Sequence, residues 1–171
     1  MDLPFDPIER AGELWEDRFG PAAAMRVATS IMRAQQLLIA RFDATLKPYG
    51  LSFARYEALV LLHFSRAGAL PLSVIGERLM VHPTSVTNTI DRLAAQDFVE
   101  RRPNPRDGRG VLAAITAAGR DVVARATEDL MRDGFGLTAY DEEQLSELFG
   151  LLRMLRVDAG DFSADGARPG L

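Results

Sequence analysis

The chain has 171 residues, of which 47% are hydrophobic and 26% charged, as in an ordinary globular protein of one domain with extensions. It has no cysteine and only two histidines, which excludes disulfides, thiol redox chemistry and cysteine-based zinc sites. The net charge of −4 argues against indiscriminate coating of nucleic acid. No signal peptide or membrane span is visible, so we expect a cytoplasmic protein without metal or cofactor.

The N-terminal part of the chain is predicted to hold a short helix and a long one. Residues 1–20 form an acidic extension in which residues 8–15 can be helical, ended by Gly20 and Pro21. A helix of about 39 Å is predicted over residues 22–47. Its length exceeds the needs of a small domain, so we expect part of it to pack on another subunit. Apolar residues recur along it at helical spacing: Val27, Ile31, Ala34, Leu38, Phe42 and Leu46.

The middle of the chain is predicted to hold three helices separated by short links. Ser52 can cap a buried helix over residues 53–64, and residues 66–71 are predicted to be a loop. A short helix over residues 72–80 contains Gly76, which lets a neighbouring helix approach closely. After a turn, Pro83 suits the first position of a helix that runs to about residue 96.

This last helix has an unusual polar face. Val86, Ile90 and Leu93 form its inward stripe. Threonine and serine lower helix propensity, so a function other than helix stability must favour them here. Hydrogen bonding to base edges and phosphates would explain them, whereas the alternative is capping and solvated surface. The outward residues are Thr84, Ser85, Thr87, Asn88 and Asp91.

The following segment is predicted to be a cationic hairpin. Its strands span residues 98–102 and 110–115, joined by a turn rich in Pro, Asn and Gly. Four arginines (Arg101, Arg102, Arg106 and Arg109) and one acid (Asp107) give a local charge of +3. Arg101 and Arg102 should point to opposite faces of their strand. A polar helix for the major groove beside a cationic hairpin for the minor groove is an arrangement suited to reading DNA.

Two helices are predicted in the C-terminal part. Thr116 can cap a helix over residues 117–132, which the glycines at 134 and 136 interrupt. A capping box within residues 138–141 is predicted to open a last helix, and residues 158–171 are predicted to be disordered. Leucines at positions 145, 148, 152 and 155 form a narrow seam of the kind found in coiled coils.

Several of these segments together resemble the MarR family of winged-helix bacterial transcription regulators. The resemblance spans residues 22–157. The helix-turn-helix segments 72–79 and 83–93 carry it, together with the entry to the wing at residues 98–101. The signature of the wing follows, with Asp107-Gly108-Arg109, Leu112, Ile115-Thr116 and Gly119-Arg120. It implies a mainly α fold with a small β-hairpin wing, that is, a winged helix-turn-helix with added dimerisation helices. The DNA-binding lobe would be residues 51–116, and the dimerisation helices residues 22–47, 117–133 and 138–157. A homodimer implies a palindromic operator with half-sites about 34 Å apart.

The residues of this helix and hairpin suggest individual roles at the DNA, and for Asp107 the resemblance implies one. Asn88 is the best base reader, since its amide can pair bidentately with adenine. Arg92 is expected to contact phosphate, the alternative being a base contact. Arg106 is expected to contact the DNA backbone, and Arg109 to enter the minor groove. Asp107 is expected to orient Arg109 through a salt bridge, the alternative being an ordinary turn residue. The expected DNA-binding residues are Pro83, Thr84, Ser85, Thr87, Asn88, Arg92, Arg106, Asp107 and Arg109.

An effector site is harder to locate. Family members bind small aromatic or phenolic anions, and one branch binds urate through Trp, Asp and two Arg. Trp15, Glu57 and Arg101 fall near three of those places, but Glu replaces Asp and Thr89 stands at the fourth, which argues against urate. The alternative for Trp15 is a hydrophobic anchor on the partner subunit.

The expected function is therefore that of a homodimeric repressor of a palindromic operator, released by a small aromatic or anionic ligand. The alternative is a winged-helix module that binds protein instead of DNA. Enzymatic activity is disfavoured, because the sequence shows no nucleophile–base pair, metal-ligand spacing or phosphate loop.

Overall fold

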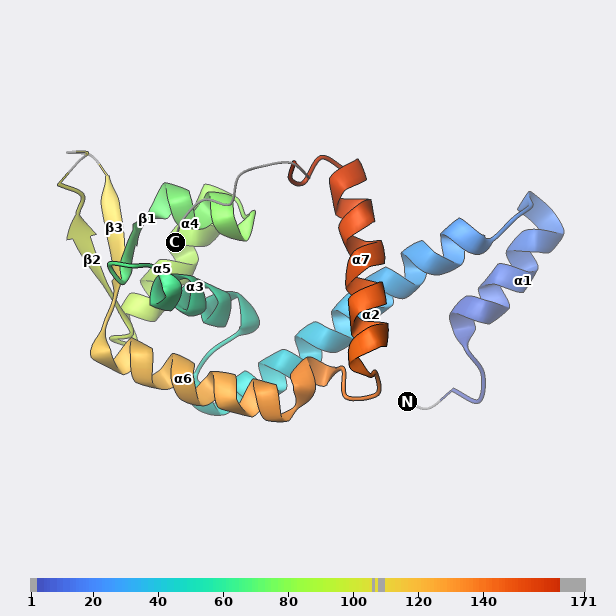
Figure 1. The fold of residues 1–171 in the computed structure, drawn as a ribbon, viewed down its shortest axis with the longest axis horizontal. Helices are drawn as coiled ribbons and strands as arrows, with labels where there is room; N and C mark the ends of the chain where they lie inside the picture. Colours follow the sequence, from blue (N-terminus) through green and yellow to red (C-terminus); the bar gives the residue numbers. More distant parts are fainter. Residues whose placement is uncertain (1–2, 106, 108–109, 164–171) are drawn as a thin grey trace.

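The computed structural model describes residues 3–105, 107 and 110–163 and confirms the mainly helical fold with a small sheet (Figure 1). The helices are α1 (Pro7–Phe19), α2 (Ala23–Leu46), α3 (Phe53–Phe64), α4 (Leu72–Leu79), α5 (Pro83–Ala94), α6 (Ala117–Arg132) and α7 (Glu142–Asp158). The strands are β1 (Ala69–Pro71), β2 (Val99–Pro103) and β3 (Val111–Ile115). Short 3-10 turns, η1 (Lys47–Tyr49) and η2 (Gly134–Gly136), follow α2 and α6.

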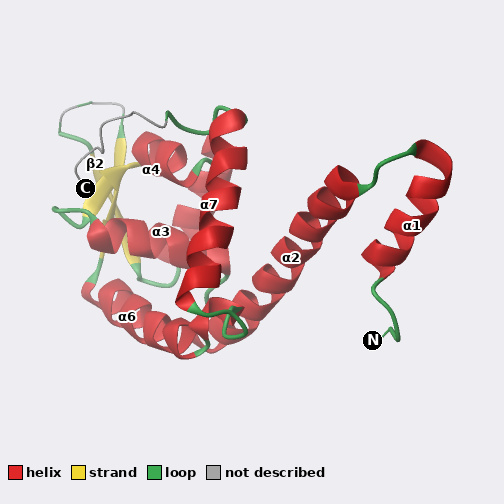
Figure 2. Cartoon of the chain, turned by 45° about the vertical axis from the view of Figure 1, so that its right-hand side comes forward, coloured by secondary structure: helices red, strands yellow, loops and turns green. Residues whose placement is uncertain are grey.

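The hydrophobic core of the described residues lies where α3 meets α4, α5 and α6. Figure 2 shows α3 between α4 and α6. Leu59 and Leu62 of α3 are fully buried, as the apolar character of this helix predicts. α5 contributes Ile90 and Leu93, and the end of α2 reaches the same core through Leu46. The core therefore fixes α5 on its apolar side and leaves its opposite side to solvent.

The sheet has three antiparallel strands in the order β1–β3–β2. The prediction of a loop over residues 66–71 is wrong at its end, because Ala69–Pro71 pairs with β3, Leu70 lying opposite Ala113. The strand has only three residues and no alternating pattern. It forms because β3 offers it a free edge of backbone hydrogen-bonding groups, which the sequence of β1 itself does not reveal.

Gly76 confirms the predicted close approach between α4 and its neighbour. A Cβ added there would lie 3.3 Å from the Val81 carbonyl oxygen and 3.3 Å from Val86 Cγ2. Both atoms would have to give way by a few tenths of an ångström. The missing side chain thus allows α4 to pack closely on the turn and on the first part of α5.

α2 is the long helix that the sequence predicts, and only its C-terminal end is buried. Phe42 and Leu46 enter the core, whereas Val27 is 59% exposed. α2 extends from the lobe to α1, which lies at the far end of the molecule (Figure 1). α1 is longer than expected, begins under the cap of Asp6, and is tied to α2 by an ion pair of 2.6 Å between Glu16 and Arg26.

α7 starts four residues later than predicted, because the capping box lies at Asp141 and not across residues 138–141. The Asp141 carboxylate accepts from the Gln144 backbone N–H (2.9 Å), and the Gln144 side chain accepts from the Asp141 N–H (3.1 Å). Thr138 and Asp141 fit the spacing of a capping box, but Asp141 followed by Gln144 fits it equally and lies next to the apolar seam.

The predicted disordered tail is described only in its first part. α7 continues to Asp158, and Asp161 accepts a hydrogen bond from Arg156 at 2.7 Å. Arg153 and Arg156 lie over the ring of Phe162 at 5.2 and 5.1 Å. Residues 159–163 thus contact the end of α7, and residues 164–171 lie outside the described residues.

Candidate nucleic-acid interface

α5 begins in an open, polar turn. His82 is its N-cap, and the ring Nδ1 accepts from the Thr84 backbone N–H at 3.3 Å. Pro83 occupies the first turn, as predicted, where its missing N–H leaves no unsatisfied donor. The Thr87 hydroxyl donates to the Pro83 carbonyl oxygen at 3.1 Å, so its hydrogen already has an acceptor within the helix.

The two faces of α5 differ as the sequence predicts. Val86, Ile90 and Leu93 are buried. Pro83 and Arg92 are exposed, and so are all of the predicted outward residues: Thr84, Ser85, Thr87, Asn88 and Asp91. The helix therefore presents hydroxyls, one amide, one carboxylate and one guanidinium to solvent, while its opposite side is packed on the core.

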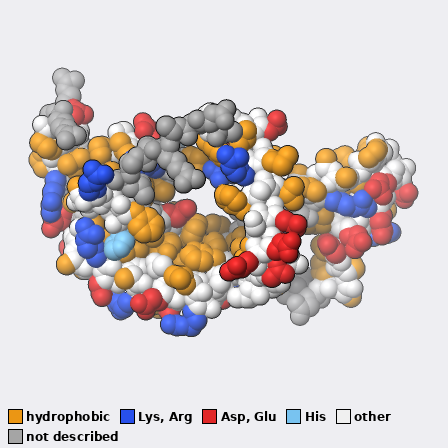
Figure 3. Space-filling view, viewed as in Figure 1, with side chains coloured by type: hydrophobic (Ala, Val, Ile, Leu, Met, Phe, Trp, Pro, Cys, Tyr) orange, Lys and Arg blue, Asp and Glu red, His pale blue; other side chains and the backbone are white. Residues whose placement is uncertain are grey.

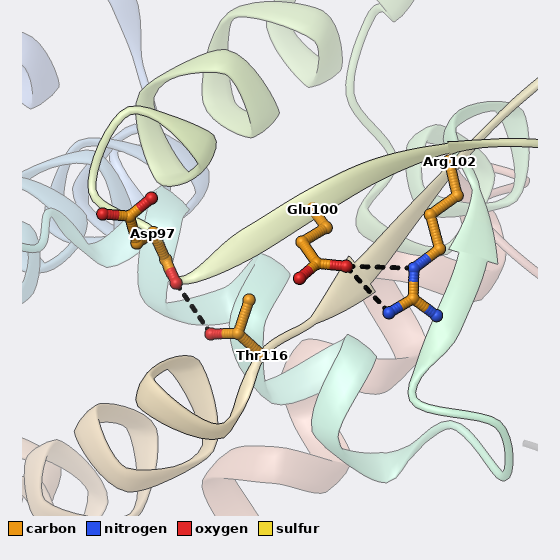
Figure 4. A network of polar contacts seen from close by, with 4 residues as sticks. All are labelled: Asp97, Glu100, Arg102 and Thr116. Atoms are coloured by element: carbon orange, nitrogen blue, oxygen red, sulfur yellow. Dashed lines mark hydrogen bonds and ion pairs between the residues drawn. The ribbon is translucent and has the colours of Figure 1, made fainter.

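Besides the pairing of β3 with β1, side-chain contacts join the wing to the rest of the lobe. At its base, the Thr116 hydroxyl donates to the Asp97 carbonyl oxygen at 2.7 Å (Figure 4). The same hydroxyl oxygen accepts from the Gly119 N–H at 2.9 Å, which confirms Thr116 as the cap of α6. Further along β2, Arg101 forms an ion pair with Asp91 of α5. The strand β2 and the helix α5 are thus held together by opposite charges.

Arg102 has a different partner from Arg101. Its guanidinium lies beside the Glu100 carboxylate on the same strand, 2.8 Å away (Figure 4). Because side chains alternate along a strand, residues 100 and 102 share one face and Arg101 lies on the other. Each of these two arginines therefore has a carboxylate partner in the described part of the chain.

The wing tip is only partly described. Arg106 and Arg109, predicted to contact phosphate and minor groove, lie outside the described residues. Asp107 is exposed; its N–H donates to the Asn104 carbonyl oxygen (3.1 Å) and its own carbonyl oxygen accepts from the Gly110 N–H (2.9 Å). The predicted salt bridge between Asp107 and Arg109 therefore stays a prediction.

Two polar residues of α3 and its N-cap adjoin the polar face of α5, and sequence reasoning missed both. Ser52 and Arg55 are half-buried, and Arg55 comes from the first turn of α3. Together with α5 they line a shallow hollow formed by Ser52, Arg55, Ser85, Asn88, Thr89 and Arg92. More than thirty residues of sequence separate Arg55 from Arg92, and no motif signals their proximity.

The structure does not bring the expected effector residues together within one chain. Trp15 lies on α1, 41% exposed, with its ring 5.0 Å from that of Phe19. Arg101 lies on β2, at the opposite end of the molecule (Figure 1). Glu57 is an exposed residue of α3, and Thr89 lies in the hollow described above. A site containing Trp15 and Arg101 would need a second subunit.

Glu57 nevertheless has an unusual environment. Desolvation by the surrounding protein raises the pKa of its carboxyl above the ordinary 4.5. The folded chain then holds a proton that the unfolded chain releases, so stability falls as pH rises from about 4.5 through the raised pKa.

Glu57→Gln is therefore expected to raise the thermal midpoint at neutral pH. The gain should be below about 1 kcal/mol, because water still screens the side chain. This gain in stability should shrink as the pH falls below the ordinary pKa of a glutamate carboxyl, where Glu57 of the wild-type protein is neutral as well. Thermal melts of both proteins across this pH range check it, and equal midpoints at every pH would contradict the desolvation.

Two other kinds of site are not found in the described part of the chain. No described cluster of three or more His, Cys, Asp or Glu could hold a metal ion. Among the described helices, none combines the length and the apolar character needed to cross a membrane.

A helix-turn-helix built from α4 and α5, backed by the hairpin β2–β3, defines a winged helix-turn-helix protein. A sequence profile of the MarR family matches residues 49–110. The chain is 34% identical over 103 residues to an uncharacterised HTH-type transcriptional regulator of Mycobacterium leprae, covering 60% of this chain and 68% of that protein.

The solved structures agree with the sequence comparison. Sco5413, a MarR family transcriptional regulator from Streptomyces coelicolor, is 63% identical, with a TM-score of 0.76 over 81% of this chain and 96% of that chain. The chain therefore belongs to the MarR family of transcriptional regulators. Sco3205, a family member from the same organism solved in complex with DNA, shares the fold at 23% identity, with a TM-score of 0.73 over 81% of this chain and 92% of that chain.

Proposed function

We propose that this protein is a homodimeric repressor that binds a palindromic operator sequence-specifically and has no enzymatic activity. The observation that carries the proposal is the exposed polar face of α5 beside the wing, since hydroxyl and amide groups on a rigid helix can read base edges in the major groove. The fold shared with Sco3205, which was solved in complex with DNA, supports DNA binding by this chain.

The apolar surfaces outside the lobe support a homodimer. α7 has no buried residue, and Phe149, Leu151 and Met154 are each more than 60% exposed. The N-terminal half of α2 exposes Val27 and Met32 in the same way. Figure 3 shows hydrophobic side chains across the middle of the visible face and acidic ones along α7. Exposed apolar side chains on both helices are stabilised when a second copy of the chain covers them and removes them from water.

We propose a role for each of the predicted DNA-binding residues. Thr84, Ser85, Thr87 and Asn88 enter the major groove, and Pro83 lets the start of α5 approach the backbone. Arg92 and Arg106 contact phosphates. Arg109 enters the minor groove, oriented by Asp107. Two copies related by a two-fold axis read half-sites about one helical turn apart.

We also propose that a small aromatic or anionic ligand releases the operator. Trp15 of one subunit, with Glu57 and Arg101 of the other, would supply an aromatic surface, a carboxyl and a guanidinium. A ligand that binds better to a dimer with misplaced recognition helices lowers operator affinity by the same free energy. The pair Asp91–Arg101 is a suitable point of coupling, because it joins this region to α5.

A hydroxyl-radical footprint on the DNA upstream of the protein's own gene tests the proposal. Two protected stretches about one helical turn apart, on one face of the duplex, are expected. Adding candidate aromatic acids should remove the protection if one of them is the effector. No protection of any duplex in dilute salt would instead favour a winged-helix module that binds protein.

The variant Arg109→Ala is expected to weaken operator binding by about 1–3 kcal/mol and to leave the dimer intact. The lost guanidinium would no longer be attracted by the negative potential of a narrow A·T minor groove. Titration of the footprinted operator by fluorescence anisotropy gives the affinity, and light scattering gives the mass. Unchanged affinity would show that Arg109 has no role in the minor groove.

A further inference from the structure

We infer that the hollow between α3 and α5 binds a phosphodiester group of the DNA backbone, and that Arg55 is the principal residue of this site. The inference rests on the proposed DNA binding and adds a contact outside the helix-turn-helix and the wing. It assigns a role to Ser52 and Arg55, which neither the recognition helix nor the wing includes.

The first argument is the charge of the hollow. Arg55 and Arg92 both line it, and its other lining side chains are neutral hydroxyls and one amide. Within the described part of the chain, neither arginine forms an ion pair with a carboxylate, although Arg26, Arg41 and Arg132 do elsewhere. In a chain with more acidic than basic residues, two guanidinium groups without a facing carboxylate create a local anion site.

The second argument is the fixed orientation of Arg55. Its Nε donates to the Ser52 hydroxyl oxygen and its Nη1 to the Gln96 side-chain oxygen, both at 3.2 Å. Gln96 is itself held by donating to the Gly50 carbonyl oxygen at 3.1 Å. Nη2 takes part in neither bond and remains available for a ligand. Less side-chain entropy is lost when a guanidinium already held in place binds an anion.

Ser52 also behaves differently from an ordinary helix cap. Its side chain makes no capping hydrogen bond in α3, and the Phe53 N–H donates to the Asp43 carboxylate at 2.7 Å instead. The Ser52 oxygen accepts from Arg55, which leaves its own hydroxyl hydrogen free to donate. Ser52 therefore supplies a second donor beside the guanidinium.

The third argument is position. The side of α5 that faces the hollow carries residues at helical spacing: Ser85, then Asn88 or Thr89, then Arg92. Asp91, which is paired with Arg101 of the wing, lies further around the helix. An α-helix is about 10–12 Å across, close to the width of the major groove, so each flank of an inserted helix faces a phosphate strand. The hollow is on one such flank.

Arg55→Gln tests the site through the salt dependence of binding. Phosphate contacts act on any sequence, so a short duplex of mixed sequence suffices, titrated by fluorescence anisotropy between about 50 and 200 mM salt. The slope of log K against log[salt] should become shallower by about 1 for each chain bound. Arg55→Lys, which retains the charge, should recover most of the slope.

The controls separate this role from a structural one. Arg18→Gln, which removes one exposed charge from α1, should leave the slope unchanged. A purely structural Arg55 would lower the thermal midpoint without changing the slope, and that result would overturn the inference. Wild-type protein that binds no duplex in dilute salt would overturn the proposed DNA binding itself, whereas normal binding with an unchanged slope for Arg55→Gln would overturn only the site.

A free anion could also occupy the hollow, and a separate measurement distinguishes it. Inorganic phosphate at constant ionic strength should stabilise wild-type protein and the Arg55→Gln variant equally if the hollow serves only DNA. Phosphate stabilisation that disappears in Arg55→Gln, together with an unchanged DNA slope, would contradict the assignment to the DNA backbone.

Discussion

Leu151→Glu combined with Met154→Glu is expected to convert the protein to monomers and to abolish operator binding. Both side chains are exposed on α7, by 66% and 69%, although each is large and apolar. Burying such a side chain in an interface contributes about 1.5–3 kcal/mol, and the dimer contains four of them. Buried unpaired carboxylates would add a further cost.

Light scattering after size-exclusion chromatography gives the mass, and anisotropy with the footprinted operator gives the affinity. The matched control is Leu151→Met with Met154→Leu, which keeps the apolar volume and should keep the dimer. A charged variant that remains dimeric at micromolar concentration would show that α7 is not part of the interface.

Asn88→Ala is expected to cost about 1–3 kcal/mol of operator affinity for each recognition helix that loses the contact. The side chain is exposed on α5 and can pair bidentately with adenine. The loss should be confined to the operator, because a base contact contributes nothing on mixed sequence. Anisotropy titrations with both duplexes at one salt concentration measure the difference.

Arg92→Gln is the informative comparison for Asn88→Ala. A phosphate contact contributes on every sequence, so this variant should weaken binding to the operator and to mixed-sequence DNA by the same factor. If Asn88→Ala instead weakened both duplexes equally, Asn88 would be a backbone contact and the base reader would have to be sought among Thr84, Ser85 and Thr87.

The helices were predictable because their signals are local. Apolar residues at helical spacing predicted α2, α3 and α5, and Thr116 together with the glycines after Arg132 gave the bounds of α6. β1 was missed because its formation depends on an edge of β3 more than forty residues away. The start of α7 was misplaced because two capping boxes fit the sequence and only one forms.

The candidate site likewise has a part that the local sequence predicts and a part that only tertiary packing creates. The polar face of α5 was predictable, since burial of Val86, Ile90 and Leu93 determines which residues remain outside. Ser52 and Arg55 were not, because only the packing of α3 against α5 brings them to that face. Trp15 and Arg101 were wrongly grouped within one chain by matching positions to the family. They lie on α1 and β2, which are at opposite ends of the molecule (Figure 1).

The most direct test of the central claim is the mass of the wild-type protein alone and with its upstream DNA, measured by analytical ultracentrifugation. The proposal predicts twice the chain mass of 18.8 kDa without DNA, and one dimer on each duplex with it. A folded species of one chain mass at micromolar concentration that leaves the duplex free in dilute salt would contradict it.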